Sequence, residues 1–230
     1  MGKFERQFMQ EMKSTLGVEL LGVASVEASG SEELRDRATA LLPGAKSVVV
    51  LGKEVYKEVV DLAKPSKGVG EAEYGDLIEP HGEYLNGRLT RGVYELGDIF
   101  RKDGYRSLPL PARGCPTDQR FLMAIFSYRH AAQFAGLGTL GRHALLITPE
   151  YGPRVRLACL LTEAPLEASP ISKENYCVDC DACIRECPAE ALRLPGEGEA
   201  YSINKYACRM YRQVGLTCTV CVKACDEVLA

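Results

Sequence analysis

The chain has 230 residues and an ordinary globular composition, with 46% hydrophobic and 26% charged residues. Its formal net charge is -3 and its basic residues do not form a run, so no nucleic acid is expected as a partner. No apolar stretch approaches the ~20 residues of a membrane-spanning helix, and the start lacks the apolar core of a signal peptide. We therefore predict a cytoplasmic protein with no membrane partner, large enough for one core and an appended module.

The N-terminal region alternates predicted helices and strands. Apolar residues at helical spacing from Phe4 predict a first helix, which ends at Gly17, where a left-handed residue can cap it. Residues 18–26 are predicted to form the next strand. Ser29 with Glu32 makes a capping-box pattern, which predicts the start of a second helix.

The central region predicts a buried strand, a loop and a long helix. Ser47–Leu51 contains three consecutive valines, which is typical of a strand buried on both faces. Residues 64–83 are rich in Gly, Pro and charge, so we expect a surface loop that could cover a site. An amphipathic helix is predicted over 85–100, ending at Gly104, and a strand over 105–110.

Residues 121–135 predict another apolar helix, with Asp118 as its N-cap. The helix leads into Gly136, Gly138 and Gly141, which spell G-x-G-x-x-G. A Rossmann fingerprint follows a strand and opens a helix, whereas here a helix precedes and a β-rich run follows, so dinucleotide binding is disfavoured. The glycines instead predict either a close approach of the backbone to a planar cofactor or packed neighbour, or a turn that needs positive φ.

A linker that contains Pro and Ser lies at 163–175. We place the domain boundary there and predict two domains, 1–165 and 166–230. Mixed helices and strands before the boundary and a cysteine-rich module after it predict an α+β fold.

The C-terminal domain holds eight of the ten cysteines, within the last 54 residues. Cys177, Cys180, Cys183 and Cys187, the last followed by proline, match the bacterial ferredoxin run C-x2-C-x2-C-x3-C-P. The first three cysteines of such a run bind one [4Fe-4S] cluster, and the fourth binds a second cluster. A second set of cysteines is therefore required, and the chain supplies it at 208–225.

Crossed ligation assigns the predicted ligands of two [4Fe-4S] clusters. The first cluster is expected to bind Cys177, Cys180, Cys183 and Cys225. The second is expected to bind Cys187, Cys208, Cys218 and Cys221. Two four-cysteine zinc sites are the alternative, which the uninterrupted triplet and the Cys-Pro step disfavour.

The two remaining cysteines, Cys115 and Cys159, precede the linker. Cys159 lies in an apolar strand and is expected to be a buried small hydrophobe. Cys115 lies between Gly114 and Pro116 on a loop, where we expect a bystander rather than a reactive thiol.

Together, the glycine-rich stretch and the cysteine pattern resemble the epoxyqueuosine reductase and reductive dehalogenase group of cobalamin-dependent iron–sulfur proteins. The segment HAAQFAGLGTLGRHALLITPEYGPRVRLACLLTEAPL is similar to the core segment of that group. Upstream, LGVELLGV, LLPGAKSVVV and LNGRLTRGVYELGDIFRKDGYRSLPLP are similar to the reductases more weakly. The resemblance covers most of the chain.

The resemblance implies a nitroreductase-like α/β core with a C-terminal two-cluster ferredoxin-like domain. The core would hold base-off cobalamin beside the first cluster, and electrons would pass through the clusters to reduce Co(II) to Co(I). Cofactor contact carries over to Gly136, Gly138, Gly141, Arg142 and His143, which match the segment that lies against the corrin in the family. FMN in the same cavity is the alternative cofactor that the fold relationship implies.

The resemblance fails where the reductases carry a proton-donating aspartate, because residues 110–112 read Leu-Pro-Ala. The chain also ends five residues after Cys225, without the helical repeats that help the reductases to bind tRNA, so we expect a short form of the family. A catalytic proton donor would have to come from elsewhere, and Tyr128 and His130 are the nearest candidates besides Asp118.

Two functions remain open from the sequence. The first is a cobalamin-dependent oxidoreductase that acts on a small-molecule substrate and receives electrons from a ferredoxin- or flavodoxin-type protein. The second is an electron-transfer or activating protein that supplies low-potential electrons to a partner, such as a corrinoid protein, without substrate chemistry of its own. The lack of the aspartate favours the second.

Overall fold

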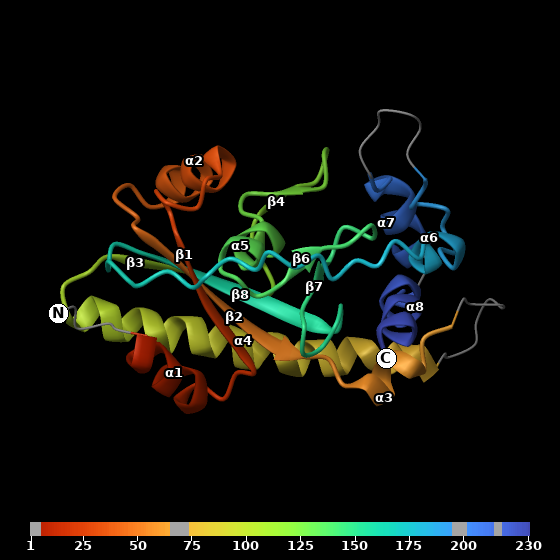
Figure 1. The fold of residues 1–230 in the computed structure, drawn as a ribbon, viewed down its shortest axis with the longest axis horizontal. Helices are drawn as coiled ribbons and strands as arrows, with labels where there is room; N and C mark the ends of the chain where they lie inside the picture. The colour runs from red at the N-terminus through yellow and green to blue at the C-terminus, as the bar shows by residue number, and fades with distance from the viewer. Residues whose placement is uncertain (1–5, 65–73, 195–201, 214–217) are drawn as a thin grey trace. The chain divides into compact units, whose positions relative to one another are not determined.

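The computed structural model describes residues 6–64, 74–194, 202–213 and 218–230. They form two compact units that mix helices and strands, in agreement with the predicted α+β class (Figure 1). Unit 1 comprises the described parts of Met1–Glu54, Leu85–Gly138 and Arg156–Glu174, and unit 2 those of Val55–Tyr84, Thr139–Val155 and Asn175–Ala230. The domain boundary between 165 and 166 stays a prediction. None of the described helices is long and apolar enough to cross a membrane.

Unit 1 is built on a four-stranded sheet. Its strands, in spatial order, are β1 (Leu20–Ser25), β2 (Ser47–Glu54), β8 (Val155–Thr162) and β3 (Ser107–Leu110). The two outer pairs are antiparallel, with Val23 opposite Val49 and Leu110 opposite Cys159. The strand predicted at 47–51 is confirmed as β2, in which every residue before Glu54 is buried. Because both faces of the strand are buried, its valines follow one another without the polar residues that alternate in a half-exposed strand.

The long helix α4 (Ile78–Lys102) crosses one face of the sheet (Figure 1). Apolar side chains at helical spacing are fully buried along it, among them Leu85 and, in the main core cluster, Leu89, Val93, Leu96 and Phe100. The last four form one apolar cluster with Val49, Leu51 and Leu160 of the sheet and with Met9 of helix α1 (Arg6–Thr15). Each such side chain stabilises the fold by about 1.5–3 kcal/mol through burial. The predicted amphipathic helix is therefore confirmed, and the core of unit 1 lies between it and the sheet.

The opposite face of the sheet is covered by helix α5 (Tyr128–Phe134). Val23 belongs to the cluster under α4, so its neighbour Gly22 points to the other face of β1. A Cβ at Gly22 would meet the carbonyl oxygen of Ala135, directly after α5. Glycine at this position therefore allows the end of α5 to lie against the strand.

The start of α4 differs from the prediction. The helix begins at Ile78, so the loop predicted over 64–83 is wrong from residue 78 onward, and Tyr74–Leu77 form a 3-10 turn, η1. Residues 65–73 lie outside the described residues. The helix start was not predicted because the segment contains Pro80, and proline usually ends a helix. Pro80 lies in the first turn, where backbone N–H groups have no helical acceptor, so its missing N–H costs no hydrogen bond.

Helix α2 (Glu32–Leu41) is capped by Ser31, and not by Ser29 as predicted. Ser31 Oγ accepts a hydrogen bond from the backbone N–H of Leu34 at 3.2 Å, which is the usual N-cap bond. Ser29 Oγ instead accepts from the N–H of Ser31 at 3.4 Å, in the turn before the helix. Both serines precede the same acidic first turn, so the sequence pattern did not separate them.

The helix predicted over 121–135 is wrong over its first half. This part of the chain forms the hairpin of β4 (Thr117–Asp118) and β5 (Met123–Ala124), and only α5 is helical. Phe121 and Met123 are 59% and 46% exposed, so the apolar run before Tyr128 is not the buried face of a helix.

Asp118 does not cap a helix, contrary to the prediction. Its carboxylate accepts a hydrogen bond from Arg120 Nη2 at 2.8 Å and another from the Arg120 backbone N–H. These bonds hold the pKa of Asp118 below its usual value. Ser127 occupies the N-cap position of α5 instead.

The glycine-rich turn after α5 leads into strands. Gly136 and Gly138 have φ values of +75° and +154°, as a turn that needs positive φ requires. Strand β6 (Thr139–Leu140) follows and pairs with β7 (Leu146–Ile147), and a bridge between Thr148 and Gly152 precedes β8. A strand thus stands where a dinucleotide fingerprint needs a helix, and the predicted helix-to-strand order is confirmed.

Unit 2 consists of short elements around the cysteine-rich region. Besides the β6–β7 hairpin they are α3 (Lys57–Asp61), α6 (Ala182–Arg185), α7 (Lys205–Gln213) and α8 (Val220–Leu229). Helix α8 packs against both α6 and α3. Since α6 and α8 both carry cysteines, this packing brings the two ends of the cysteine-rich region together.

Replacement of Gly136 by alanine tests the role of this residue in the turn. The Cβ of an alanine there would meet the carbonyl oxygen of Pro170. The alanine would also have to adopt a left-handed backbone conformation. We expect Gly136→Ala to destabilise the protein by at least about 1 kcal/mol, measured by chemical denaturation followed by circular dichroism. Gly87→Ala is the matched control because nothing lies near its Cβ inside α4, and it is expected to stabilise by about 0.5–1 kcal/mol. Equal effects of the two changes would contradict the packing argument.

Candidate functional site

The cysteine loop starts at Cys177 and winds tightly into α6. Asp179 and Asp181 both adopt φ of +55°, a left-handed conformation that Asp tolerates better than most residues. Arg185 Nη1 donates to the carbonyl oxygen of Cys180 at 2.7 Å, which ties the loop to the helix that follows it. The two left-handed residues turn the backbone sharply enough to present successive cysteines to one side.

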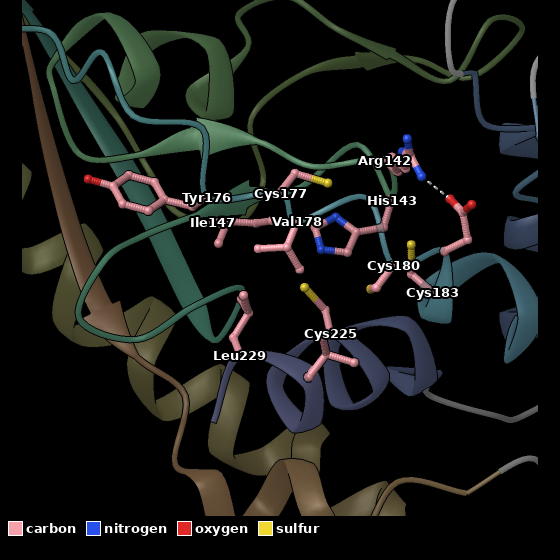
Figure 2. Close-up of a pocket in the computed structure, with 12 residues that line it drawn as sticks. Arg142, His143, Ile147, Tyr176, Cys177, Val178, Cys180, Cys183, Cys225 and Leu229 are labelled. Atoms are coloured by element: carbon pink, nitrogen blue, oxygen red, sulfur yellow. Dashed lines mark hydrogen bonds and ion pairs between the residues drawn. The ribbon is translucent and has the colours of Figure 1, made fainter.

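One cavity of unit 2 is lined by four cysteines, Cys177, Cys180, Cys183 and Cys225. The first three come from the loop and α6, and Cys225 comes from α8 (Figure 2). Burial raises the pKa of the Cys225 thiol to about 12, and the negative charges of the other three thiolates raise it further. Four sulfur ligands from two separate segments thus share one space.

A second group of cysteines surrounds Cys221 of α8. Burial, together with the nearby cysteines Cys218, Cys208, Cys187 and Cys183, raises the pKa of the Cys221 thiol to about 12. Cys208 comes from α7, and Cys187 Sγ accepts a hydrogen bond from the N–H of Ala191 at 3.3 Å. The neighbours of Cys221 include the other members of the second predicted ligand set and also Cys183 of the first set, so the division into two ligand sets stays a prediction.

The spacing within the groups bears on the choice of metal. In the part of the chain that the structure describes, no three His, Cys, Asp or Glu side chains are grouped so that they could hold a metal ion. A zinc ion binds all four of its thiolates itself, whereas the thiolates around a cubane bind different irons and lie further apart. The choice of a [4Fe-4S] cluster over zinc stays a prediction from the cysteine spacing.

Arg142 joins the β6–β7 hairpin to the cysteine loop. Its guanidinium makes an ion pair with Asp179 at 2.8 Å and a second ion pair with Asp181 (Figure 2). The Arg142 and Asp181 side chains are only 17% and 26% exposed, so their ion pair lies partly out of water, whereas Asp179 is 68% exposed and its ion pair is weakened by solvent. Arg142 therefore holds the loop in its left-handed turns.

His143 lies in the same cavity and is almost fully buried, with 2% exposed. Its Nδ1 accepts a hydrogen bond from the backbone N–H of Leu145 at 3.1 Å. Among the described residues, its Nε2 has no hydrogen-bond partner. Burial lowers the pKa of His143 to about 4, so the ring is neutral near pH 7. A Cβ at Gly141 would come within 2.9 Å of the His143 ring, so glycine there leaves room for the imidazole.

The predicted corrin-contacting residues are distributed between the two units. Gly136 and Gly138 belong to unit 1, and Gly141, Arg142 and His143 belong to unit 2. The space beside Gly136 is filled by the backbone at Pro170. The side chains of Arg142 and His143 are turned to the cysteine loop and its cavity. Cofactor contact by these residues stays a prediction.

A buried ionic network anchors α8 next to Cys225. Asp226 is 7% exposed and accepts hydrogen bonds from Arg154 Nε at 2.6 Å and from Lys57 Nζ at 3.0 Å. Arg154 Nη1 also donates to the carbonyl oxygen of Val55 at 2.9 Å. The network ties α8 to α3 and to the turn before β8, and so fixes where Cys225 points.

The two proposed proton donors, Tyr128 and His130, lie on α5 in unit 1. Tyr128 donates to the carbonyl oxygen of Pro111 at 2.8 Å, and burial together with a hydrogen bond to Cys115 raises its pKa. Burial lowers the pKa of His130, and the charge of Arg129 lowers it further. Both pKa values move away from neutrality, where a general acid works best. Catalysis by either residue stays a prediction.

The two cysteines outside the groups differ in burial. Cys159 is fully buried in β8, which confirms the prediction of a small hydrophobic residue. Cys115 is half-buried on its loop beside Tyr128. Neither belongs to one of the two groups.

The sequence did not single out the residues that position the cysteines, which are Asp179, Asp181, Arg154, Asp226 and Lys57. The aspartates were visible as acidic residues inside and just after cysteine motifs. No pattern in the sequence indicated that Arg154 lies beside Asp226, because 72 positions separate them.

Known proteins resemble this chain in sequence, although no protein-family model matches it. An epoxyqueuosine reductase of Bacillus subtilis is 38% identical over 186 residues, which cover 78% of this chain and 44% of the relative. A tetrachloroethene reductive dehalogenase of Desulfitobacterium hafniense is 33% identical over 188 residues, which cover 80% of this chain and 29% of the relative. The chain is a relative of epoxyqueuosine reductases and reductive dehalogenases. It spans less than half the length of these curated relatives.

Solved structures show the same fold. A reductive dehalogenase whose structure suggests a mechanism for B12-dependent dehalogenation has a TM-score of 0.69 and 19% identity, over 95% of this chain and 31% of that one. An epoxyqueuosine reductase in complex with a tRNA stem loop has a TM-score of 0.50 and 20% identity, over 81% of this chain and 52% of that one. The second complex runs against our expectation that nucleic acid is not a partner, which for this chain stays a prediction.

Loss of the buried pair beside Cys225 tests whether the network anchors α8. Arg154→Met leaves Asp226 buried with Lys57 as its remaining partner among the contacts described above, and we expect a loss of about 3 kcal/mol in unfolding free energy. Denaturant titration of the anaerobically purified protein measures the change. Glu95→Gln removes an exposed ion pair on α4 and should leave the denaturation midpoint nearly unchanged. An Arg154→Met protein as stable as the parent would show that the network does not hold the helix.

Proposed function

We propose that the chain is an iron–sulfur redox protein that carries two [4Fe-4S] clusters and delivers electrons to a corrinoid. The observation that supports this most directly is the cavity lined by Cys177, Cys180, Cys183 and Cys225. The ferredoxin-like spacing of the cysteines and the relationship to reductive dehalogenases support it independently. Cys187, Cys208, Cys218 and Cys221 would bind the second cluster.

The position of the cysteines on α8 supports electron transfer between two adjacent clusters. Cys221 and Cys225 are four residues apart on one helix, so their side chains lie on the same face, one turn apart. Each belongs to a different group of cysteines. A single helical turn would therefore separate a ligand of one cluster from a ligand of the other, and electrons could pass between clusters one at a time.

The burial of the thiols explains why the groups need metal to become charged. Cys221 and Cys225 have pKa values raised to about 12, so at neutral pH they hold their protons when no cation is near. Iron binding replaces those protons and compensates the negative charge of the thiolates. Folding of this region would accordingly be coupled to cluster assembly.

A corrinoid, when bound, supplies a strong nucleophile and reductant. Our proposal of a corrinoid rests on the relatives, one of which is described as B12-dependent. Residues 141–143 adjoin the first cysteine cavity, so a group bound against the backbone of this segment would lie close to the first cluster. The chain's own contribution would be to keep the cysteine loop in place through Arg142.

A second function, that of an electron carrier for a separate corrinoid protein, is favoured by the surroundings of the predicted proton donors. Residues 110–112 contain no acid, and Tyr128 donates its hydrogen bond to the Pro111 carbonyl. The pKa values of Tyr128 and His130 are shifted away from neutrality in opposite directions. An electron carrier does no substrate chemistry and needs no proton donor of its own. The carrier function is therefore compatible with these pKa shifts.

Serine substitutions test the ligand sets one at a time. We expect about eight irons per chain in the parent and about four in Cys225→Ser and in Cys208→Ser, because each change removes a ligand of only one cluster. Iron and sulfide analysis with EPR of the reduced protein measures this. Cys115→Ser is the control and should keep about eight irons. Four irons in the parent, or zinc without sulfide, would refute the two-cluster proposal.

Cofactor content separates the reductase from the carrier. The protein is purified anaerobically from cells supplied with cobalamin, and cobalt and flavin are quantified per chain. About one cobalt per chain would support the reductase. Clusters without cobalt, even after incubation with cobalamin, would favour the carrier, and bound flavin would point to FMN.

Binding of tRNA at physiological salt would contradict our expectation of a small-molecule or protein partner.

A further inference from the structure

We propose that His143 donates a hydrogen bond from Nε2 to a sulfur atom of the cluster bound by Cys177, Cys180, Cys183 and Cys225, and thereby raises the reduction potential of that cluster. This inference rests on the proposed function, since it requires the first cluster to be present. It assigns His143 a role toward the cluster instead of the corrin contact expected from the sequence. His143 would be a positioning and tuning residue, and not a ligand.

The hydrogen bond to Leu145 determines which ring nitrogen carries the proton. Nδ1 of His143 accepts from the backbone N–H of Leu145 at 3.1 Å, so Nδ1 itself has no hydrogen. In a neutral imidazole the hydrogen must then be on Nε2. Nε2 is therefore a donor, and the short loop from His143 to Leu145 fixes this tautomer.

Nε2 makes no hydrogen bond to any of the residues that the structure describes. His143 is 2% exposed, and a buried N–H without an acceptor is destabilising because it has lost its hydrogen bonds to water. The ring projects into the cavity that the four cysteines line (Figure 2). The sulfur atoms of a cluster in this cavity would supply the missing acceptor.

The same tautomer excludes His143 as an iron ligand. A nitrogen that carries a hydrogen has no lone pair available for a metal, and Nδ1 is occupied by the Leu145 bond. Ile147 and Val178 also line the cavity and are apolar, so neither can take the place of the histidine as a donor. Arg142, the nearest cation in sequence, is paired with Asp179 and Asp181.

The direction of the effect follows from charge. Reduction adds one negative charge to the cluster, and a hydrogen-bond donor stabilises the more negative state. Removal of the donor therefore makes reduction less favourable and lowers the potential. Only the cluster in contact with His143 should respond, because the other group of cysteines does not line this cavity.

The test is an EPR-monitored redox titration of the anaerobically purified protein and its His143→Phe variant. Phenylalanine keeps an aromatic ring in the cavity but has no N–H. We expect the midpoint potential of one cluster to fall and that of the other to stay unchanged. In His143→Gln an amide N–H is kept, so the fall should be smaller than in His143→Phe. His81→Phe is the matched control, because His81 does not line the cavity and should shift neither potential.

A measurement on the unmutated protein covers the case in which His143→Phe does not fold. The chain has three histidines, and only His143 lines the cavity. Pulsed EPR of the reduced protein labelled with 15N-histidine should detect one histidine nitrogen and an exchangeable proton coupled to the cluster. Full iron content with neither a coupling nor a potential shift would overturn the inference alone. A parent protein without clusters would instead refute the proposed function.

Discussion

The carboxylate of Asp226 is buried between Arg154 and Lys57, one residue beyond Cys225. Helix α8 must be oriented so that Cys225 faces the cysteine loop. The ion pairs of Asp226 hold the helix in that orientation. The charges of Asp226 and Arg154 would each be costly to bury alone, so these two residues stabilise unit 2 as a pair, to which the 45% exposed Lys57 adds a more solvated contact. The cavity with four cysteines depends on this arrangement, because three of its sulfur atoms come from the loop and the fourth comes from α8.

Two further ionic contacts hold the cysteine loop in its conformation. Arg142 pairs with Asp179 and Asp181, the two residues whose left-handed backbone turns the loop back on itself. The β6–β7 hairpin thus supplies one cation that holds the loop and one histidine whose N–H faces the cavity, at adjacent positions in the sequence.

Prediction from the sequence succeeded where a local pattern had one physical meaning. The stripe from Leu89 to Phe100 fits an amphipathic helix, and a run of three valines fits a strand buried on both faces. It failed at residues 121–127, where an apolar run forms an exposed hairpin, and at Pro80, which lies inside a helix. The apolar run at 121–127 did not reveal that its side chains are exposed, and Pro80 is tolerated because it lies in the first turn of α4.

The sequence by itself determined the set of sulfur ligands that is available, and the cysteine spacing predicts how they would divide between two clusters. It also determined the relationship to epoxyqueuosine reductases and reductive dehalogenases. Only the tertiary structure decided that Arg154 meets Asp226 across 72 positions and that His143 turns an unpartnered N–H into the cysteine cavity. These contacts join segments that are distant in the chain, and the free energy of burying charges and donors becomes defined only when their neighbours are in place.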